Sequence, residues 1–276
     1  RGGALGETAR PRKEGEDVNK PLCGMRQAAG MGSDGWAVWA LGQLQDELLE
    51  ELAQILGDMD DMLVVPFSLL DNIVALFGKP PPALGERPIT LLAMIYRLYT
   101  RLYGEDVNIW EKAYAQKWDL ALKGNSAQQA AVRHVLMDEL DVMEGLQTIG
   151  VMLDMEKFYD NISIPKLLGE AELLDYPAHC MSMGIQMHMA PRLIKARDCY
   201  CYAPLPSNGI IAGCTQSNSF ARVLLHRLMD TAYHQQCIDG ERRLVRQFVD
   251  DLRFTIAHHS PKICMKMVVR RGAQLG

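Results

Sequence analysis

Two adjacent aspartates near the C-terminal end of the sequence restrict most strongly how this chain can fold. Asp250 and Asp251 separate two short strand-like runs, 244–249 and 252–256. Apolar and polar residues alternate in the second run, with the period of a half-buried strand. The pattern predicts a hairpin with two acids at its tip. Adjacent carboxylates repel each other, and Asn-Gly or Asp-Gly would suit a tight turn better, so we expect a cation to compensate them.

A third aspartate, Asp154, closes an earlier apolar run, 148–153. An aspartate just past a strand is commonly a helix N-cap. Paired acids also occur where no site is expected, since Asp60 and Asp61 follow a helical pattern and are predicted to form a solvated helix end. If a sheet brings Asp154 to the acidic hairpin, the three carboxylates can hold divalent metal ions over a phosphate group.

The composition is that of an ordinary globular protein. Of 276 residues, 48% are hydrophobic and 23% are charged, which suits one large domain or two closely packed subdomains. The net charge of −5 argues mildly against a nucleic-acid binder, because phosphates are neutralised by Lys and Arg. The basic residues fall in short groups, however, and binding depends on local fields.

The sequence favours a reducing intracellular compartment, whether nuclear or cytoplasmic. Its seven cysteines are scattered in a pattern that suits neither a disulfide framework nor a zinc site. No apolar run approaches a membrane span and no signal peptide is evident, so no membrane partner is expected. The sequence begins without Met, which is consistent with a piece of a longer protein. It indicates no oligomeric state.

Helical periodicity and helix breakers divide the chain into segments. Residues 1–34 are Gly-rich and charged and are expected to form a flexible tail. A helical pattern spans 36–56, with Gly57 as its expected C-cap. A long amphipathic helix is expected over 126–146. Its apolar face is formed by Val132, Val135, Leu136, Leu140, Met143 and Leu146.

Three segments follow one another in a recognisable order. The first is Leu153-Asp154-Met155-Glu156-Lys157-Phe158-Tyr159-Asp160, and the second is a glycine-containing turn, 209–217, that enters a helix. The third is Phe248-Val249-Asp250-Asp251. In type, order and approximate spacing, these segments resemble motifs A, B and C of a reverse transcriptase of the kind carried by non-LTR retroelements. The resemblance spans residues 32–276.

The resemblance extends upstream of these motifs. The segment 32–36 resembles the lead into the fingers of retroelement polymerases. In the fingers hairpin of the family, a Lys and an Arg contact the incoming triphosphate, and Lys79 and Arg87 match them. Arg97 and Arg101 lie at i and i+4 on one expected helical face, where they would contact template phosphates. The alternative for Lys79 and Arg87 is an exposed loop with two ordinary surface cations. The alternative for Arg97 and Arg101 is that they merely flank a core helix.

The resemblance implies an α+β fold of the right-hand polymerase type. The expected palm is an antiparallel sheet backed by helices, and the expected fingers are mostly helical and carry a hairpin. The fingers would span 35–147 and the palm 148–276, with an inserted fingers segment at about 185–207. The chain would stop before the thumb, which is expected to be missing.

The implied reaction is template-directed nucleotidyl transfer by an RNA-directed DNA polymerase that uses dNTPs, an RNA template and a DNA primer. Asp154, Asp250 and Asp251 would be the catalytic carboxylates that bind two Mg²⁺ ions. Tyr159 matches the aromatic residue that excludes a 2′-hydroxyl and so selects dNTPs. Gly213 matches the glycine whose backbone approaches the nucleotide closely.

Motif B departs from the family pattern Gly-x-Pro-Gln-Gly, because Ile211 and Ala212 stand in place of Pro and Gln. Gln216, in the following turn, is a candidate for the missing glutamine contact. Two alternatives therefore stay open. One is a truncated or decayed copy that binds nucleic acid without catalysis, and the other is a viral-type RNA-directed RNA polymerase, against which Tyr159 argues.

Overall fold

The fold is α+β and contains two compact units. The computed structural model describes residues 10–78, 80–81, 85–122, 124–196, 199–234, 242–249 and 251–272. Unit 1 comprises Arg1–Asn108 and Asp175–Ser217, and unit 2 comprises Ile109–Leu174 and Asn218–Gly276. These boundaries differ from the predicted 35–147 and 148–276, because the chain enters unit 2 well before residue 148. The segment that returns to unit 1 is also longer than the predicted 185–207.

Unit 1 is built mainly from helices. They are α1 (Gly15–Cys23), α2 (Val38–Leu41), α3 (Asp46–Met62), η1 (Phe67–Leu69), α4 (Met94–Leu102) and α8 (Ala178–His188), while α5 (Gly104–Ala113) contains the boundary with unit 2. Helix α1 packs on α3 and buries Val18 and Leu22, which corrects the predicted tail for residues 15–23. Gly57 lies inside α3, because the helix runs on to Met62, so the predicted C-cap is wrong.

The sheet of unit 1 has four strands in the order β2-β1-β4-β5. They are β1 (Asn72–Gly78), β2 (Glu86–Leu91), β4 (Arg192–Ala196) and β5 (Cys199–Tyr202). Strands β1 and β2 form the predicted antiparallel hairpin. Strand β4 pairs with β1 in parallel, so the returning segment extends the sheet that the hairpin begins.

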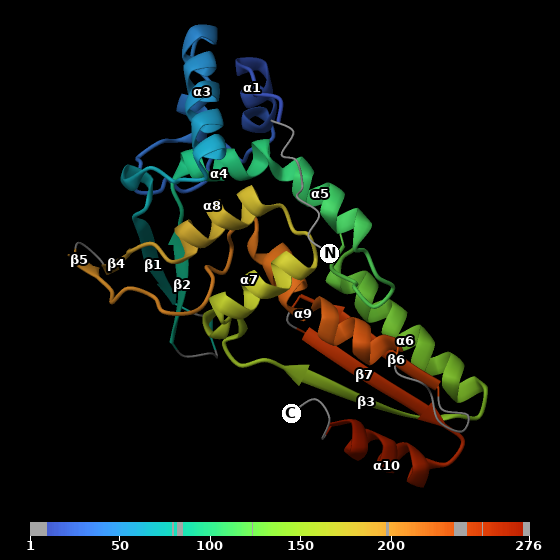
Figure 1. The fold of residues 1–276 in the computed structure, drawn as a ribbon. Coiled ribbons are helices and arrows are strands. Elements are labelled where there is room, and N and C mark those ends of the chain that lie inside the picture. Colours follow the sequence, from blue (N-terminus) through green and yellow to red (C-terminus); the bar gives the residue numbers. More distant parts are fainter. Residues whose placement is uncertain are drawn as a thin grey trace. The chain divides into compact units, whose positions relative to one another are not determined.

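Unit 2 carries an antiparallel sheet of three strands in the order β3-β7-β6. The strands are β3 (Gln147–Asp154), β6 (Arg242–Phe248) and β7 (Asp251–His258). The helices are α6 (Ala127–Met143), η2 (Phe158–Asn161), α7 (Ile164–Leu173), α9 (Ser217–His234) and α10 (Pro261–Gly272). Helix α10 packs against β3 and β7, and α6 contacts β3 (Figure 1).

Helix α6 begins with a capping box, in which Ser126 accepts a hydrogen bond from the N–H of Gln129. The helix confirms the predicted segment, but its apolar face is largely exposed. The exposed members of this face are Val132, Val135, Leu136, Leu140 and Met143. Among the helices that the structure describes, none is long and apolar enough to cross a membrane.

Candidate functional site

Asp154 and Asp251 are cross-strand partners in the sheet of unit 2. Asp154 is the last residue of β3 and Asp251 is the first of β7, and the register of the two strands pairs them directly. Directly opposite residues in an antiparallel pair have Cβ atoms about 4.5–5.5 Å apart and side chains on one face. Both aspartates are exposed. The fold therefore brings together two of the three predicted acids, although they lie far apart in the sequence.

The acidic hairpin also forms, with its turn one residue earlier than the sequence suggested. Phe248 pairs with Asp251, which leaves Val249 and Asp250 between the strands. Val249 has φ 59°, a left-handed conformation that is rare for a β-branched residue. The side chain of Gln247 donates a 2.7 Å hydrogen bond to the carbonyl of Val249 and so supports this turn. Asp250 itself lies outside the described residues.

Two exposed carboxylates side by side are a donor set that suits a hard divalent cation such as Mg²⁺. Among the described residues, no group of three His, Cys, Asp or Glu side chains is placed to hold a metal. Asp250, the third predicted ligand, does not belong to the described residues. The pair Asp154 and Asp251 thus fits the predicted metal site in chemistry and register.

A row of arginines lies next to the acids on the same sheet face. Arg253 is two residues from Asp251 along β7 and pairs across the strands with Arg246. The Arg253 guanidinium makes a 2.5 Å ion pair with Asp138 on α6. Burial, with the charges of Arg253 and Arg246, lowers the pKa of His134 to about 4, which keeps this neighbour neutral. The sheet thus places positive charge one step from the paired acids.

A buried ion pair anchors the hairpin from its outer side. Arg222 on α9 bonds the carboxylates of Asp119 and Glu111. Burial alone would lower the pKa of Arg222, but Asp119 and Glu111 outweigh it and raise the pKa. Asp119 forms a parallel bridge with Gln247, and the N–H of Gln247 donates to the carbonyl of Trp118 at 2.8 Å. Arg222 therefore holds the segment on which the acidic hairpin rests.

Sequence reasoning missed Arg222 and Asp119. Both are buried charged residues, and the only sequence signal was their position inside otherwise apolar segments. Charged residues are rarely buried unless they are paired. An isolated arginine among apolar residues of a helix is thus a reason to look for an acidic partner, although it does not identify which one.

Tyr159 lies in the same unit as the paired acids, just after β3. Its hydroxyl donates a 3.0 Å hydrogen bond to the side-chain oxygen of Asn218, and its ring packs edge-on against the buried Phe158. Lys157 has φ 49°, so the chain turns sharply between Asp154 and Tyr159. Asn218 orients the phenol ring, and this orienting contact was not predicted.

The glycine-containing turn lies in unit 1 and is held at Ile211. Its N–H donates a 2.7 Å hydrogen bond to Nδ1 of His188, and its carbonyl accepts one of 2.6 Å from the Ser217 hydroxyl. Burial, with the charge of Arg192, lowers the pKa of His188 to about 3, so the imidazole stays neutral and accepts this bond. Gly213 has φ 89°, a left-handed conformation that favours glycine, and its close approach to a nucleotide stays a prediction.

Gln216 does not replace the glutamine contact that motif B lacks. Its side chain is buried and accepts a 3.3 Å hydrogen bond from the hydroxyl of Tyr96. A side chain enclosed in this way packs the interior of unit 1. The contact of the turn's glycine backbone with a nucleotide stays a prediction, and Gln216 is enclosed away from this surface.

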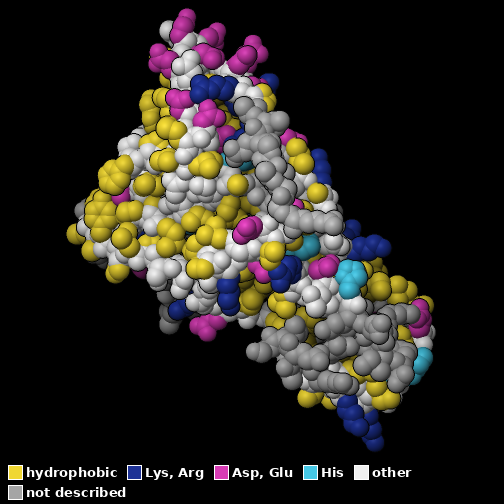
Figure 2. All heavy atoms as spheres, viewed as in Figure 1, with side chains coloured by type: hydrophobic (Ala, Val, Ile, Leu, Met, Phe, Trp, Pro, Cys, Tyr) yellow, Lys and Arg dark blue, Asp and Glu magenta, His cyan; other side chains and the backbone are white. Residues whose placement is uncertain are grey.

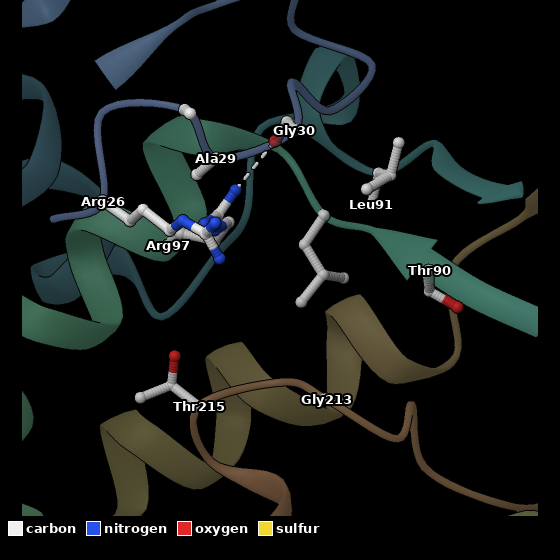
Figure 3. Close-up of a pocket in the computed structure, with 10 residues that line it drawn as sticks. Arg26, Ala29, Gly30, Thr90, Leu91, Arg97, Gly213 and Thr215 are labelled. Carbon is white, nitrogen blue, oxygen red and sulfur yellow. Dashed lines mark hydrogen bonds between the residues drawn. The ribbon is translucent and has the colours of Figure 1, made fainter. Parts of the chain in front are cut away.

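Arg97 and Gly213, which were predicted to contact different ligands, line one pocket of unit 1 (Figure 3). The Arg97 guanidinium donates a 2.9 Å hydrogen bond to the carbonyl of Gly30. Burial lowers the pKa of Arg97, and the neighbouring charge of Arg101 lowers it further, so the two arginines lie close together as predicted. Arg26 is a further cation in this pocket and was not predicted.

Of the two cations predicted to contact the triphosphate, the structure describes only Arg87. Arg87 is exposed on β2, where it pairs with Phe77 of β1. Lys79 lies outside the described residues. The hairpin that connects these positions is present, and the contact of either cation with a triphosphate stays a prediction.

The segment 32–36 packs against the start of α4. A Cβ on Gly32 would lie 2.3 Å from the carbonyl oxygen of Leu92, so only glycine fits there. The Ser33 hydroxyl donates a 2.5 Å hydrogen bond to the carbonyl of Asp71. Asp34 accepts a 3.0 Å hydrogen bond from the N–H of Ile95 in the first turn of α4.

Asp60 is buried, so the prediction that Asp60 and Asp61 form a solvated helix end is wrong for Asp60. Asp61 is exposed and pairs with Arg12, but Asp60 is only 3% exposed. It accepts a 2.6 Å hydrogen bond from the Tyr99 hydroxyl and forms a 2.9 Å ion pair with Arg10. A structural role in the interior of unit 1 accounts for this acid.

No protein-family model matches the sequence, and a comparison with curated proteins finds no match.

Proposed function

We propose that this chain is an RNA-directed DNA polymerase domain, a reverse transcriptase, which transfers nucleotides from dNTPs to a primer on an RNA template. The observation that carries the proposal is the pairing of Asp154 with Asp251 at the ends of two adjacent strands. In this proposal, the sheet of unit 2 and its helices are the polymerase palm, and the β1–β2 hairpin belongs to the fingers.

The acidic pair has features that are typical of functional sites and that lower the stability of the fold. Like charges placed directly opposite each other in a sheet are destabilising. Val249 adds a sparsely populated backbone conformation beside them, a kind of strain that clusters at functional sites. Arg222 and Gln247, in turn, hold the strained hairpin in place. A solvated turn without a function needs none of these features.

Two Mg²⁺ ions would be held by Asp154 and Asp251, with Asp250 as the third expected ligand. When bound, the metal supplies Lewis-acid stabilisation of charge at the reacting phosphate and at the 3′-hydroxyl. The residues of the chain keep their carboxylates adjacent and exposed, and the neighbouring arginine row moderates their repulsion. Arg87 and Lys79 would contribute positive charge at the triphosphate.

Tyr159 is proposed to select dNTPs by excluding the 2′-hydroxyl. Its hydrogen bond to Asn218 fixes the ring, and a fixed ring makes a firm steric barrier. The same residue argues against the RNA polymerase alternative. If Tyr159 acts in this way, Tyr159→Ala admits ribonucleotides, whereas Tyr159→Phe keeps the barrier and loses only the hydrogen bond.

Primer extension on an RNA template tests the proposal. The purified chain is expected to incorporate dNTPs with Mg²⁺ and to stop in EDTA. Asp154→Asn and Asp251→Asn should each abolish extension, while Glu139→Gln, which removes an exposed acid from α6 in the same unit, should leave it unchanged.

The outcomes separate the three candidate functions. A strong preference for ribonucleotides would replace the proposal with an RNA polymerase. Binding of the template-primer without any extension would favour the decayed copy. If primer extension is retained in both aspartate variants, the paired acids are not needed for the reaction.

A further inference from the structure

One pocket of unit 1 collects positive charge without an acid beside it. The pocket has a volume of about 350 Å³ and contains the guanidinium groups of Arg26 and Arg97, which extend into the same part of it (Figure 3). No carboxylate occurs among the described residues that line it. Asp34 acts on Arg97 from outside the pocket, but its effect on the pKa is smaller than those of burial and Arg101. Two neighbouring cations in a pocket whose described lining contains no carboxylate attract an anion.

We propose that this pocket binds a phosphate group of a single-stranded nucleic acid, with Arg26 and Arg97 as joint ligands of the phosphate oxygens. The inference rests on the proposed polymerase function, which it deepens by adding Arg26 and Thr215 to the expected template contacts. A guanidinium presents several N–H donors in a planar fork that matches a phosphate. Arg97 uses one of them for Gly30, which fixes its position and leaves others for a ligand.

The remaining walls of the pocket suit a nucleotide unit. Thr90 and Thr215 contribute hydroxyl groups, which donate well to phosphate oxygens. Leu91 and Leu92 provide apolar surface for a sugar. A Cβ built on Gly213 meets no atom within 4 Å, so the space above this backbone is open to a ligand.

The size and the surrounding charge favour a strand over a free nucleotide. The volume lies at the lower end of the about 300–1,000 Å³ of ligand pockets, which suits one phosphate with its sugar. Arg101, four residues after Arg97 on α4, is a further exposed cation that a second phosphate of a strand could contact. Acidic side chains gather over α1 and α3 of the same unit (Figure 2). The exposed acids of these two helices are Glu16, Asp46, Glu47, Glu50, Glu51, Asp58 and Asp61.

Binding of a fluorescent RNA oligonucleotide, followed by anisotropy over a salt series without Mg²⁺ or dNTPs, tests the inference. Arg26→Gln should weaken binding about tenfold, as expected for the loss of one charged hydrogen bond. The slope of log K against log salt should fall by about 0.7, the value for one phosphate contact on a single strand. Arg26→Lys should retain most of the slope and lose part of the affinity, because it keeps the charge without the fork.

Lys20→Gln is the matched control. Lys20 is an exposed cation of the same unit that does not line the pocket, so its loss should leave both affinity and slope unchanged. Thermal unfolding confirms that each variant is folded, and the exposed position of Arg26 makes this expected. The inference is overturned if the chain does not bind the RNA, or if Arg26→Gln behaves like the control.

A second ligand distinguishes the source of the phosphate. If Arg26→Gln weakens binding of a free nucleoside triphosphate and leaves RNA binding intact, the pocket belongs to a nucleotide and the strand assignment is wrong. Binding through Arg26 by a chain that cannot extend a primer would uphold the pocket and reject the polymerase. If the chain extends a primer and Arg26→Gln leaves its RNA binding unchanged, the polymerase function stands and the pocket assignment is wrong.

Discussion

Asp154 and Asp251 face each other across β3 and β7, at the exposed end of the sheet in unit 2. Their strands are joined by more than ninety residues of intervening chain, so the pairing is a tertiary feature. Two carboxylates in this relation repel each other and stabilise the fold only when a cation lies between them. The pair therefore makes stability depend on a divalent metal in a way that can be measured without any enzymatic assay.

The first prediction concerns this repulsion. In EDTA, Asp154→Asn should raise the free energy of unfolding by about 0.2–1 kcal/mol, because one of two opposed charges is removed. With Mg²⁺, the wild-type chain should gain stability and the variant should gain little, since a ligand stabilises only the state that binds it. Thermal unfolding of both chains, with EDTA and with Mg²⁺, measures the two effects. Glu139→Gln removes an exposed acid of α6 that does not belong to the acidic pair, and it should show neither effect. A Mg²⁺ response that persists in Asp154→Asn would place the metal elsewhere.

The second prediction concerns the anchor of the acidic hairpin. Arg222→Leu should destabilise the chain by about 3–5 kcal/mol, because it leaves Asp119 buried without its charge partner. Asp119→Asn keeps the acceptor for the N–H of Ala121 and removes the charge. The double variant should therefore be less destabilised than the sum of the two single variants. Urea unfolding of the four chains gives the coupling energy. Strict additivity would show that the two side chains do not act as a pair.

The sequence predicted the strands of the acid site better than their register. Apolar runs that end in acids are local features, and β3, β6 and β7 follow them closely. The turn falls one residue early, at Val249, because Gln247 and the Trp118 segment fix the end of β6. Such contacts between distant segments leave no periodic trace in the sequence. The pairing of Arg222 with Asp119 was unpredictable for the same reason.

In unit 1, the hairpin and the glycine turn were predictable, and the first helix was missed. The Gly-rich composition of residues 1–34 suggested a tail, but Val18, Leu22 and Met25 recur at helical spacing and are buried. The periodicity was a better guide than the composition. Arg26 lies three residues beyond the end of this helix, so the prediction of a tail also missed a cation of the pocket.

The third prediction concerns pH and the glycine turn. Because burial lowers the pKa of His188 to about 3, the unfolded chain, with a pKa near 6.5, binds more protons between these values. Stability from His188 is therefore complete above about pH 6.5 and is lost as the pH falls towards 3. Between pH 7 and pH 5 the loss is about 2 kcal/mol.

His188→Asn isolates this contribution. The asparagine oxygen can accept the hydrogen bond of Ile211 and does not titrate in this range. Urea unfolding at pH 7 and pH 5 should show a smaller pH dependence in His188→Asn than in the wild-type chain. His259→Asn, at an exposed position of unit 2, is the control and should retain the wild-type dependence. Equal pH dependence in all three chains would mean that His188 does not hold the turn as a neutral acceptor.

The fourth prediction compares the substitution of alanine for two glycines of unit 1. Gly32→Ala should lower the free energy of unfolding by about 1–3 kcal/mol, since its Cβ would meet the Leu92 carbonyl oxygen at 2.3 Å and the Ala93 Cα at 2.6 Å. Gly57→Ala should raise it by up to about 1 kcal/mol, because it lies inside α3 and its Cβ meets no atom within 4 Å. The same chemical change thus has opposite signs at the two sites, and urea midpoints compare them directly. A neutral Gly32→Ala would show that the lead-in does not pack against the start of α4.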